Sequence, residues 1–260
     1  MKRPARQMVW DAGAAAMLLF ALAGLFFTPR DPRAQSFRDL APSGPSSAHW
    51  LGVDGLGRDF LSRLWEGLGH TVLLSGAALL LTFIFAAVLL LIEQGGPARI
   101  ARMVRSLMGL AVAVPVLFIG LLLLVFLHPS PGALVLAVGI GNTSFAFRQL
   151  RVFWQTVRGA LFVRSSEVLG ARGWLLFRWA LWPNLQPDLL ALARLLFAMS
   201  ALELSGLAFL GLIGDPDFTE LGSILRQNQA YLYQVPLLVV LPGLLLSLLL
   251  LTLHLSRFHR

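Results

Sequence analysis

The sequence predicts an all-α membrane protein with six transmembrane helices. Of its 260 residues, 57% are hydrophobic and only 13% are charged, and the mean hydropathy is +0.75, which is far from the profile of a soluble domain. Several uncharged runs are long enough to cross the hydrocarbon core of a bilayer. The basic residues lie between these runs instead of forming one patch, so they indicate membrane topology and not a nucleic-acid partner.

The apolar runs set the expected spans. The first, residues 12–28, follows a basic N-terminus. We interpret it as an uncleaved span in preference to a secretory signal peptide, because no clear A-x-A site closes it and more spans follow. Pro115 lies inside the third span, where the carbonyl group that it leaves free favours a kink. The other five spans are expected at residues 71–92, 107–127, 132–147, 189–213 and 235–256.

The distribution of basic residues predicts the orientation. Six spans place both termini on one side of the membrane, together with the connections at 94–106 and 148–184. These segments hold 14 of the 21 Lys and Arg residues. Because positively charged connections stay in the cytoplasm, both termini and the long basic connection are expected there.

A glycine-rich stretch, AHWLGVDGLGRDFLSRLWEGLGH at 48–70, follows the first span. Glycines around Asp54, among them Gly57, predict tight turns that Arg58 and Asp59 can fix through charge-assisted hydrogen bonds. A phosphate-binding loop is a poor alternative, because no GK[ST] follows and no strand precedes the glycines.

The end of this stretch predicts a helix at the membrane surface. Apolar residues recur at helical spacing over 60–68, opposite Arg63 and Glu66. Residues 1–70 are therefore expected to comprise the first span, an extracytoplasmic loop and an interfacial helix. Residues 71–260 are expected to form a core of five further spans.

The longest basic segment is GALFVRSSEVLGARGWLLFRWALWPN, residues 159–184, between two apolar runs. It carries Arg164, Arg172 and Arg178 against one acid, Glu167. From composition alone, the simplest interpretation is a basic connection that only fixes topology. The alternative is a surface that docks onto a partner protein, with apolar anchors at Phe162, Val163, Leu169 and Trp174.

The extracytoplasmic stretch, together with LAFLGL at 207–212, LGSILRQNQAYL at 221–232 and PG at 242–243, resembles a set of family motifs. The family comprises the inner-membrane permease subunits of binding-protein-dependent ABC importers, in the branch that serves dipeptides, oligopeptides and nickel. Its signature H-P-L-G-T-D-x-x-G-R-D-x-x-S-R-x-x-x-G is matched at His49, Leu51, Gly52, Asp54, Gly57, Arg58, Asp59, Ser62, Arg63 and Gly67.

The resemblance implies an ABC importer type I permease fold in the bacterial inner membrane, with this chain forming half of the translocation pathway for peptides. It also implies a coupling helix, within the connection 157–184, that docks onto an ATPase subunit. The glutamate of the family's E-A-A triplet is absent here, since the triplet falls on Arg-Ser-Ser. The residues expected to couple are Arg164, Ser165, Ser166, Glu167, Gly170, Arg172 and Trp174.

The resemblance also implies partners. These are a homologous permease subunit, two ATP-binding subunits and an extracytoplasmic substrate-binding protein, around a chain embedded in the lipid bilayer. ATP and Mg are expected on the ATP-binding subunits, so the chain itself is expected to bind no cofactor and to be no enzyme; it contains no Walker motif. The alternative cargo is nickel or a metal–metallophore complex.

Polar residues within the expected spans are candidates for the pathway. Glu203 lies near the middle of the fifth span, where a carboxylate is costly and is expected to face a pathway or a partner such as Arg194. Asn142 and Ser144 lie in the fourth span and fit either close helix packing or contact with cargo. The chain has no cysteine, and its histidines lack metal-site spacing, so no fixed metal site is expected.

Two further classes of function were compared with the importer. An intramembrane enzyme needs a nucleophile with its base or paired carboxylates, yet the sequence has neither G-x-S-x-G nor H-E-x-x-H. A non-transporting membrane scaffold is the other alternative, since the E-A-A triplet is altered.

Overall fold

The computed structural model describes residues 5–37 and 41–255. Basic residues expected to mark the cytoplasmic termini, such as Lys2 and Arg260, lie outside these ranges. Within them the regular elements are helices, and β-structure is limited to isolated bridges. The elements are α1 (Ala5–Ala23), α2 (Phe60–Gly95), α3 (Ala98–Ala111), α4 (Val116–Phe126), α5 (Pro131–Gly141), α6 (Thr143–Arg158), α7 (Leu161–Val168), α8 (Gly173–Leu176), a π-helical segment (Phe177–Leu181), α9 (Trp182–Phe209), α10 (Leu221–Asn228), a 3₁₀ turn (Gln229–Tyr231) and α11 (Leu237–Leu255).

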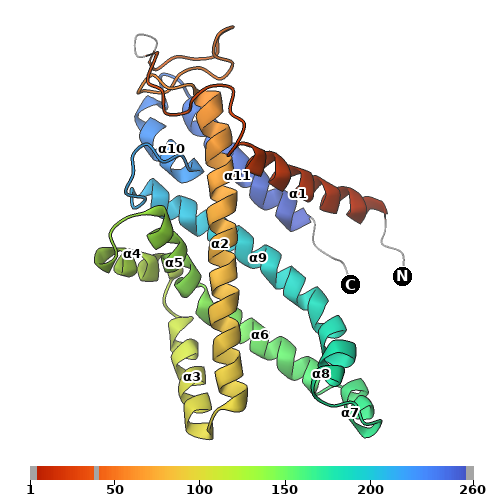
Figure 1. The fold of residues 1–260 in the computed structure, drawn as a ribbon. Coiled ribbons are helices and arrows are strands. Elements are labelled where there is room, and N and C mark those ends of the chain that lie inside the picture. Colours follow the sequence, from red (N-terminus) through yellow and green to blue (C-terminus); the bar gives the residue numbers. More distant parts are fainter. Residues whose placement is uncertain (1–4, 38–40, 256–260) are drawn as a thin grey trace.

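Helix α2 is the central element of the fold. Its 36 residues give a rod about 54 Å long, which runs through the molecule between the short α10 at one end and α3 at the other (Figure 1). Among the described helices it packs against α1, α3, α5, α6, α9, α10 and α11. The other elements are therefore arranged around one continuous helix.

The expected interfacial helix is instead the beginning of α2. Phe60, Leu64 and Leu68 belong to a core cluster that also contains residues of α10 and α11, so this turn is covered by protein. Arg63, which we expected on a water-facing side, has no exposed surface. The amphipathic pattern correctly predicts a helix, but the loops and α10 cover the polar side of that helix.

Three described helical stretches are long and apolar enough to cross a membrane: Phe60–Gly95, Gly173–Phe209 and Leu237–His254. They correspond to the second, fifth and sixth expected spans. The expected third span is broken, because α3 and α4 meet at a bend of 100°. Pro115, expected to cause a kink, stands just before α4 with an extended backbone, which ends helical continuity.

The expected fourth span is also divided. Helix α5 ends at Gly141, Asn142 forms the junction, and α6 continues to Arg158 with a strongly amphipathic pattern. Apolar parts of α1 and α5 are present as shorter helices. The connection expected at 148–184 is mostly helical, since α6 and α7 occupy its first half and α8 leads without a gap into α9.

A carboxylate at the C-terminal end of α2 joins three helices. Glu93 is 5% exposed and accepts hydrogen bonds from Arg105 of α3 at 3.0 Å and from Arg151 of α6 at 2.7 Å. Buried charges are stable only when they are paired, so this carboxylate holds the ends of α2, α3 and α6 together.

The other end of α2 is held by α10. Glu220 caps α10 by accepting hydrogen bonds from the backbone N–H groups of Gly222 and Ser223, and it also accepts from the hydroxyl groups of Thr71 on α2 and Ser205 on α9. Gly222 lies directly against the backbone oxygen of Ser205, with no room for a Cβ atom. The absence of a side chain there lets α10 and α9 pack in close contact.

This contact yields a stability prediction. Gly222→Ala should lower the stability of the detergent-solubilised protein by about 1–3 kcal/mol, because the new methyl group forces two backbones apart. Gly243→Ala in α11 is the matched control, since a Cβ atom there meets open space, and it is expected to keep or raise the melting temperature. Equal melting temperatures for Gly222→Ala and the control would contradict the close packing.

Candidate functional site

The residues singled out in the sequence fall into three separate groups. The first lies in the loop before α2, the second at the contact of α9 with the α5–α6 junction, and the third around α7.

In the loop, Asp54 organises the turn that precedes α2. One carboxylate oxygen accepts hydrogen bonds from the backbone N–H groups of Leu56 and Arg58, at 2.9 and 3.0 Å. The other accepts from Arg58 Nε at 2.8 Å and lies 3.3 Å from Arg63 Nε. Gly57 takes a positive φ of 79°, which suits glycine and lets the chain fold back over the carboxylate.

Two arginines connect this turn to the region around α10. Arg58 and Arg63 both donate to the side-chain oxygen of Gln227, at 2.7 and 2.9 Å, and both are fully buried. Arg58 also contacts Asp217 at 3.3 Å. Asp217 and Gln227 were not among the predicted site residues, because about 160 positions separate them from Arg58 and no local pattern signals the contact.

Asp59 has a local role at the start of α2. Its carboxylate accepts hydrogen bonds from the backbone N–H and hydroxyl of Ser62, at 3.0 and 2.8 Å, and lies 2.9 Å from His49 Nδ1. It is therefore an N-cap that also anchors the loop. Burial alone would raise the pKa of Asp59, but the hydrogen bonds from His49 and Ser62 outweigh it and lower the pKa.

The two acids that contact Arg58 allow a matched test. Asp54→Asn should cost about 3–5 kcal/mol of stability, because it leaves two buried guanidinium groups without their central charge. Asp217→Asn should cost less than about 1 kcal/mol, since that carboxylate is half exposed and water can replace it. Thermal unfolding of the two variants checks the difference, and equal losses would show that Asp54 is not the centre of the network.

The second group is a polar pair between apolar helices. Asn142 Nδ2 donates to Glu203 Oε2 at 2.6 Å. Asn142 is fully buried, and within the described residues its side-chain oxygen has no hydrogen-bond partner. Ser144 is also buried but lines a separate apolar cavity of about 430 Å³ bordered by α2, α3, α4, α5 and α6.

The proposed pairing of Glu203 with Arg194 is wrong. Both residues belong to the continuous helix α9, and nine positions separate them by about 13.5 Å along its axis and by half a turn around it. Their side chains therefore lie on opposite sides of α9. Asn142, at the junction of α5 and α6, provides the polar partner.

The third group surrounds α7, at the lower end of the molecule in Figure 1. Helix α7 is held by Val163, which is fully buried against Val157, Leu176 and Leu181. The exposed apolar side chains around it include Leu161 (78% exposed), Val168 (87%), Leu169 (88%) and Trp174 (73%). We expected Val163 to contact a partner, but it holds α7 to its own chain.

The polar residues of this group are accessible. Arg164, Ser165, Gly170 and Arg172 are exposed, and Glu167 forms an ion pair with Arg158 at 2.6 Å. The hydroxyl groups of the two serines donate to backbone carbonyls within α7. Gly170 ends the turn with a positive φ of 91° and has open space around it. The arrangement presents an exposed apolar and basic surface on a short, firmly held helix.

Comparisons with known proteins were made on the sequence and on the fold. The chain is 30% identical over 252 residues to the di/tripeptide transport system permease protein DppC of Pseudomonas aeruginosa, covering 94% of this chain and 83% of the relative. The chain belongs to this family of ABC importer permeases. No protein-family profile matches it. The family predicted from the sequence motifs is thus confirmed.

Other members of the family are named for different cargos. The glutathione transport system permease GsiD of Pectobacterium atrosepticum is 26% identical, with 91% of this chain and 79% of the relative covered. The nickel transport system permease NikC of Escherichia coli is 27% identical, with 89% and 83% covered. These relatives are transporter permeases and not enzymes.

A solved structure shares the fold. The crystal structure of an amino acid ABC transporter with histidines gives a TM-score of 0.61 at 18% identity, covering 74% of this chain and 89% of that one. This permease is therefore an all-helical, multi-pass membrane protein with the architecture of an ABC transporter permease. Among the described residues, no group of three or more His, Cys, Asp or Glu side chains is placed to hold a metal ion.

Proposed function

We propose that this permease forms half of the translocation pathway of an ABC importer for peptides, and that ATPases in the cytoplasm move it through α7. The peptide cargo is supported by its similarity to DppC, which is named as a di/tripeptide permease. The coupling role is supported by the exposed surface of α7. A homologous permease, two ATP-binding subunits and an extracytoplasmic binding protein complete the proposed assembly.

The physical basis of coupling is the combination of exposure and rigidity at α7. Leu161, Val168 and Leu169 leave most of their apolar surface in solvent, and Arg164 and Arg172 stand beside them. Apolar side chains that become buried on binding, with charged residues around them, are typical of a protein interface. Because Val163 fixes α7 to the cluster that leads into α9, a force applied to α7 reaches a membrane helix.

The proposed topology has six spans with both termini in the bacterial cytoplasm. Three spans are the long helices; the remaining three consist of α1, the bent pair α3–α4, and α5 with the start of α6. Broken helices are tolerated in a membrane where neighbouring protein satisfies the freed backbone groups. This assignment places α7 on the ATPase side and the Asp54 network on the side of the binding protein.

Nickel, free or as a metallophore complex, is the second candidate cargo. It is favoured by the similarity to NikC over 89% of this chain. Uptake of a radiolabelled dipeptide and of ⁶³Ni by the complete transporter separates the two candidates. Uptake of neither by an assembled complex would overturn both cargo assignments.

The coupling proposal predicts the effect of a single surface substitution. Leu169→Ser should weaken binding of the ATPase subunits by about 2 kcal/mol, because it removes an exposed apolar anchor that its own chain does not use. Binding is measured by titrating purified ATPase onto the permease. Met103→Ser, an exposed apolar position on α3, is the control and should bind normally. Normal binding by Leu169→Ser as well would remove α7 from the interface.

The topology predicts labelling by a membrane-impermeant thiol reagent. The chain has no natural cysteine, so single cysteines report cleanly. Ser47→Cys, in the loop before α2, should react in intact spheroplasts, whereas Val168→Cys should react only after permeabilisation. Both positions are exposed, so a difference in reactivity reports the side of the membrane. Reaction of Val168→Cys in intact spheroplasts would invert the orientation.

A further inference from the structure

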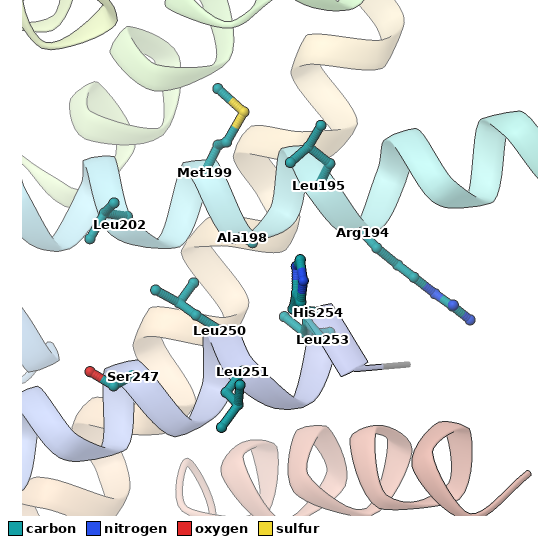
Figure 2. A pocket seen from close by; sticks show the side chains of 10 residues that line it. All are labelled: Arg194, Leu195, Ala198, Met199, Leu202, Ser247, Leu250, Leu251, Leu253 and His254. Atoms are coloured by element: carbon teal, nitrogen blue, oxygen red, sulfur yellow. The ribbon is translucent and has the colours of Figure 1, made fainter. Parts of the chain in front are cut away.

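A groove of about 480 Å³ lies between α9 and α11 (Figure 2). Arg194 and His254 line one end of it, with the Arg194 side chain pointing outward from the groove, and Leu202 and Ser247 line the opposite end. Between these ends the lining is apolar and includes Leu251. The groove therefore has a cationic end and an apolar body.

We place the cationic end close to the headgroups at one face of the membrane. His254 is followed by the end of α11, and the sequence then continues with Arg257 and Arg260. On α9, polar residues precede Arg194, whereas the five residues that follow it are apolar. Long basic side chains extend toward the headgroups from such positions. The apolar body of the groove, which begins here, lies within the hydrocarbon layer.

The dimensions favour a lipid chain over a transmembrane helix as the occupant. The groove extends from Arg194 to Leu202 on α9, which is about 12 Å along the axis, whereas a spanning helix is about 30 Å long. One acyl chain fits a short apolar groove of this kind. A phosphate group at its mouth then meets Arg194 and His254 through charge-assisted hydrogen bonds.

We propose that the α9–α11 groove is a binding site for an anionic phospholipid, with its phosphate at Arg194 and His254 and an acyl chain along the apolar lining. Basic pockets between membrane helices on the cytoplasmic side bind anionic headgroups, because both the charge and the apolar depth match. The cytoplasmic position of the groove rests on the proposed topology, but the inference does not depend on the identity of the cargo.

The test uses the complete transporter in vesicles of phosphatidylcholine with or without phosphatidylglycerol. After extraction into detergent, the retained lipid is quantified by mass spectrometry. Arg194→Gln should retain about tenfold less phosphatidylglycerol, which is the effect of one charge-assisted hydrogen bond. Leu251→Trp, which fills the groove without altering its charge, should reduce retention as well. Arg102→Gln, an exposed arginine of α3, is the matched control and should behave as the unaltered protein.

Three results would overturn the proposal. The first is unchanged retention in both Arg194→Gln and Leu251→Trp, provided that their melting temperatures are unchanged. The second is equal retention of phosphatidylcholine and phosphatidylglycerol by the unaltered protein. The third is efficient cross-linking of Ser247→Cys to the other permease subunit, which would make the groove a protein interface.

Discussion

The fold depends on one buried carboxylate, that of Glu220. It is placed where three helices meet, and it accepts hydrogen bonds from hydroxyl groups of α2 and α9 and from the first N–H groups of α10. Burial raises the pKa of Glu220, while the hydrogen bonds from Ser205 and Thr71 oppose that rise. The first backbone N–H groups of a buried helix need hydrogen-bond acceptors. At the N-terminus of α10, the Glu220 carboxylate supplies them.

The same requirement explains the other polar clusters. Asp54 forms ion pairs with the buried Arg58 and Arg63 at one end of α2. Glu93 forms ion pairs with Arg105 and Arg151 at the other end. Between them, the helices meet mainly through small residues and leucines, and the buried hydroxyl of Thr82 on α2 donates to backbone carbonyl groups of Ala78 and Gly139. Charge is therefore confined to the two ends of the central helix, and the contact of Asn142 with Glu203 is a polar exception among apolar helices.

The sequence predicted the parts of the fold that depend on local pattern. The long apolar runs at α2, α9 and α11 and the break at Pro115 follow from composition and from the geometry of proline. The role of Arg63 was missed, because burial of an arginine depends on Asp54 and on Gln227, which is 164 positions away. Val163 was misassigned for the same reason: an apolar residue in a basic helix fits a partner interface and an internal anchor equally well, and only packing distinguishes them.

The continuity of α2 has a mechanical consequence. A helix without a break behaves as a stiff lever, so the loop at one end and the Glu93 junction at the other cannot shift independently. Pivoting a rod of about 54 Å by about 10° around its middle displaces each end by about 5 Å in opposite directions. A pull exerted near α3 and α6 would thus swing the Asp54 turn the other way, with no signal needing to pass from side chain to side chain.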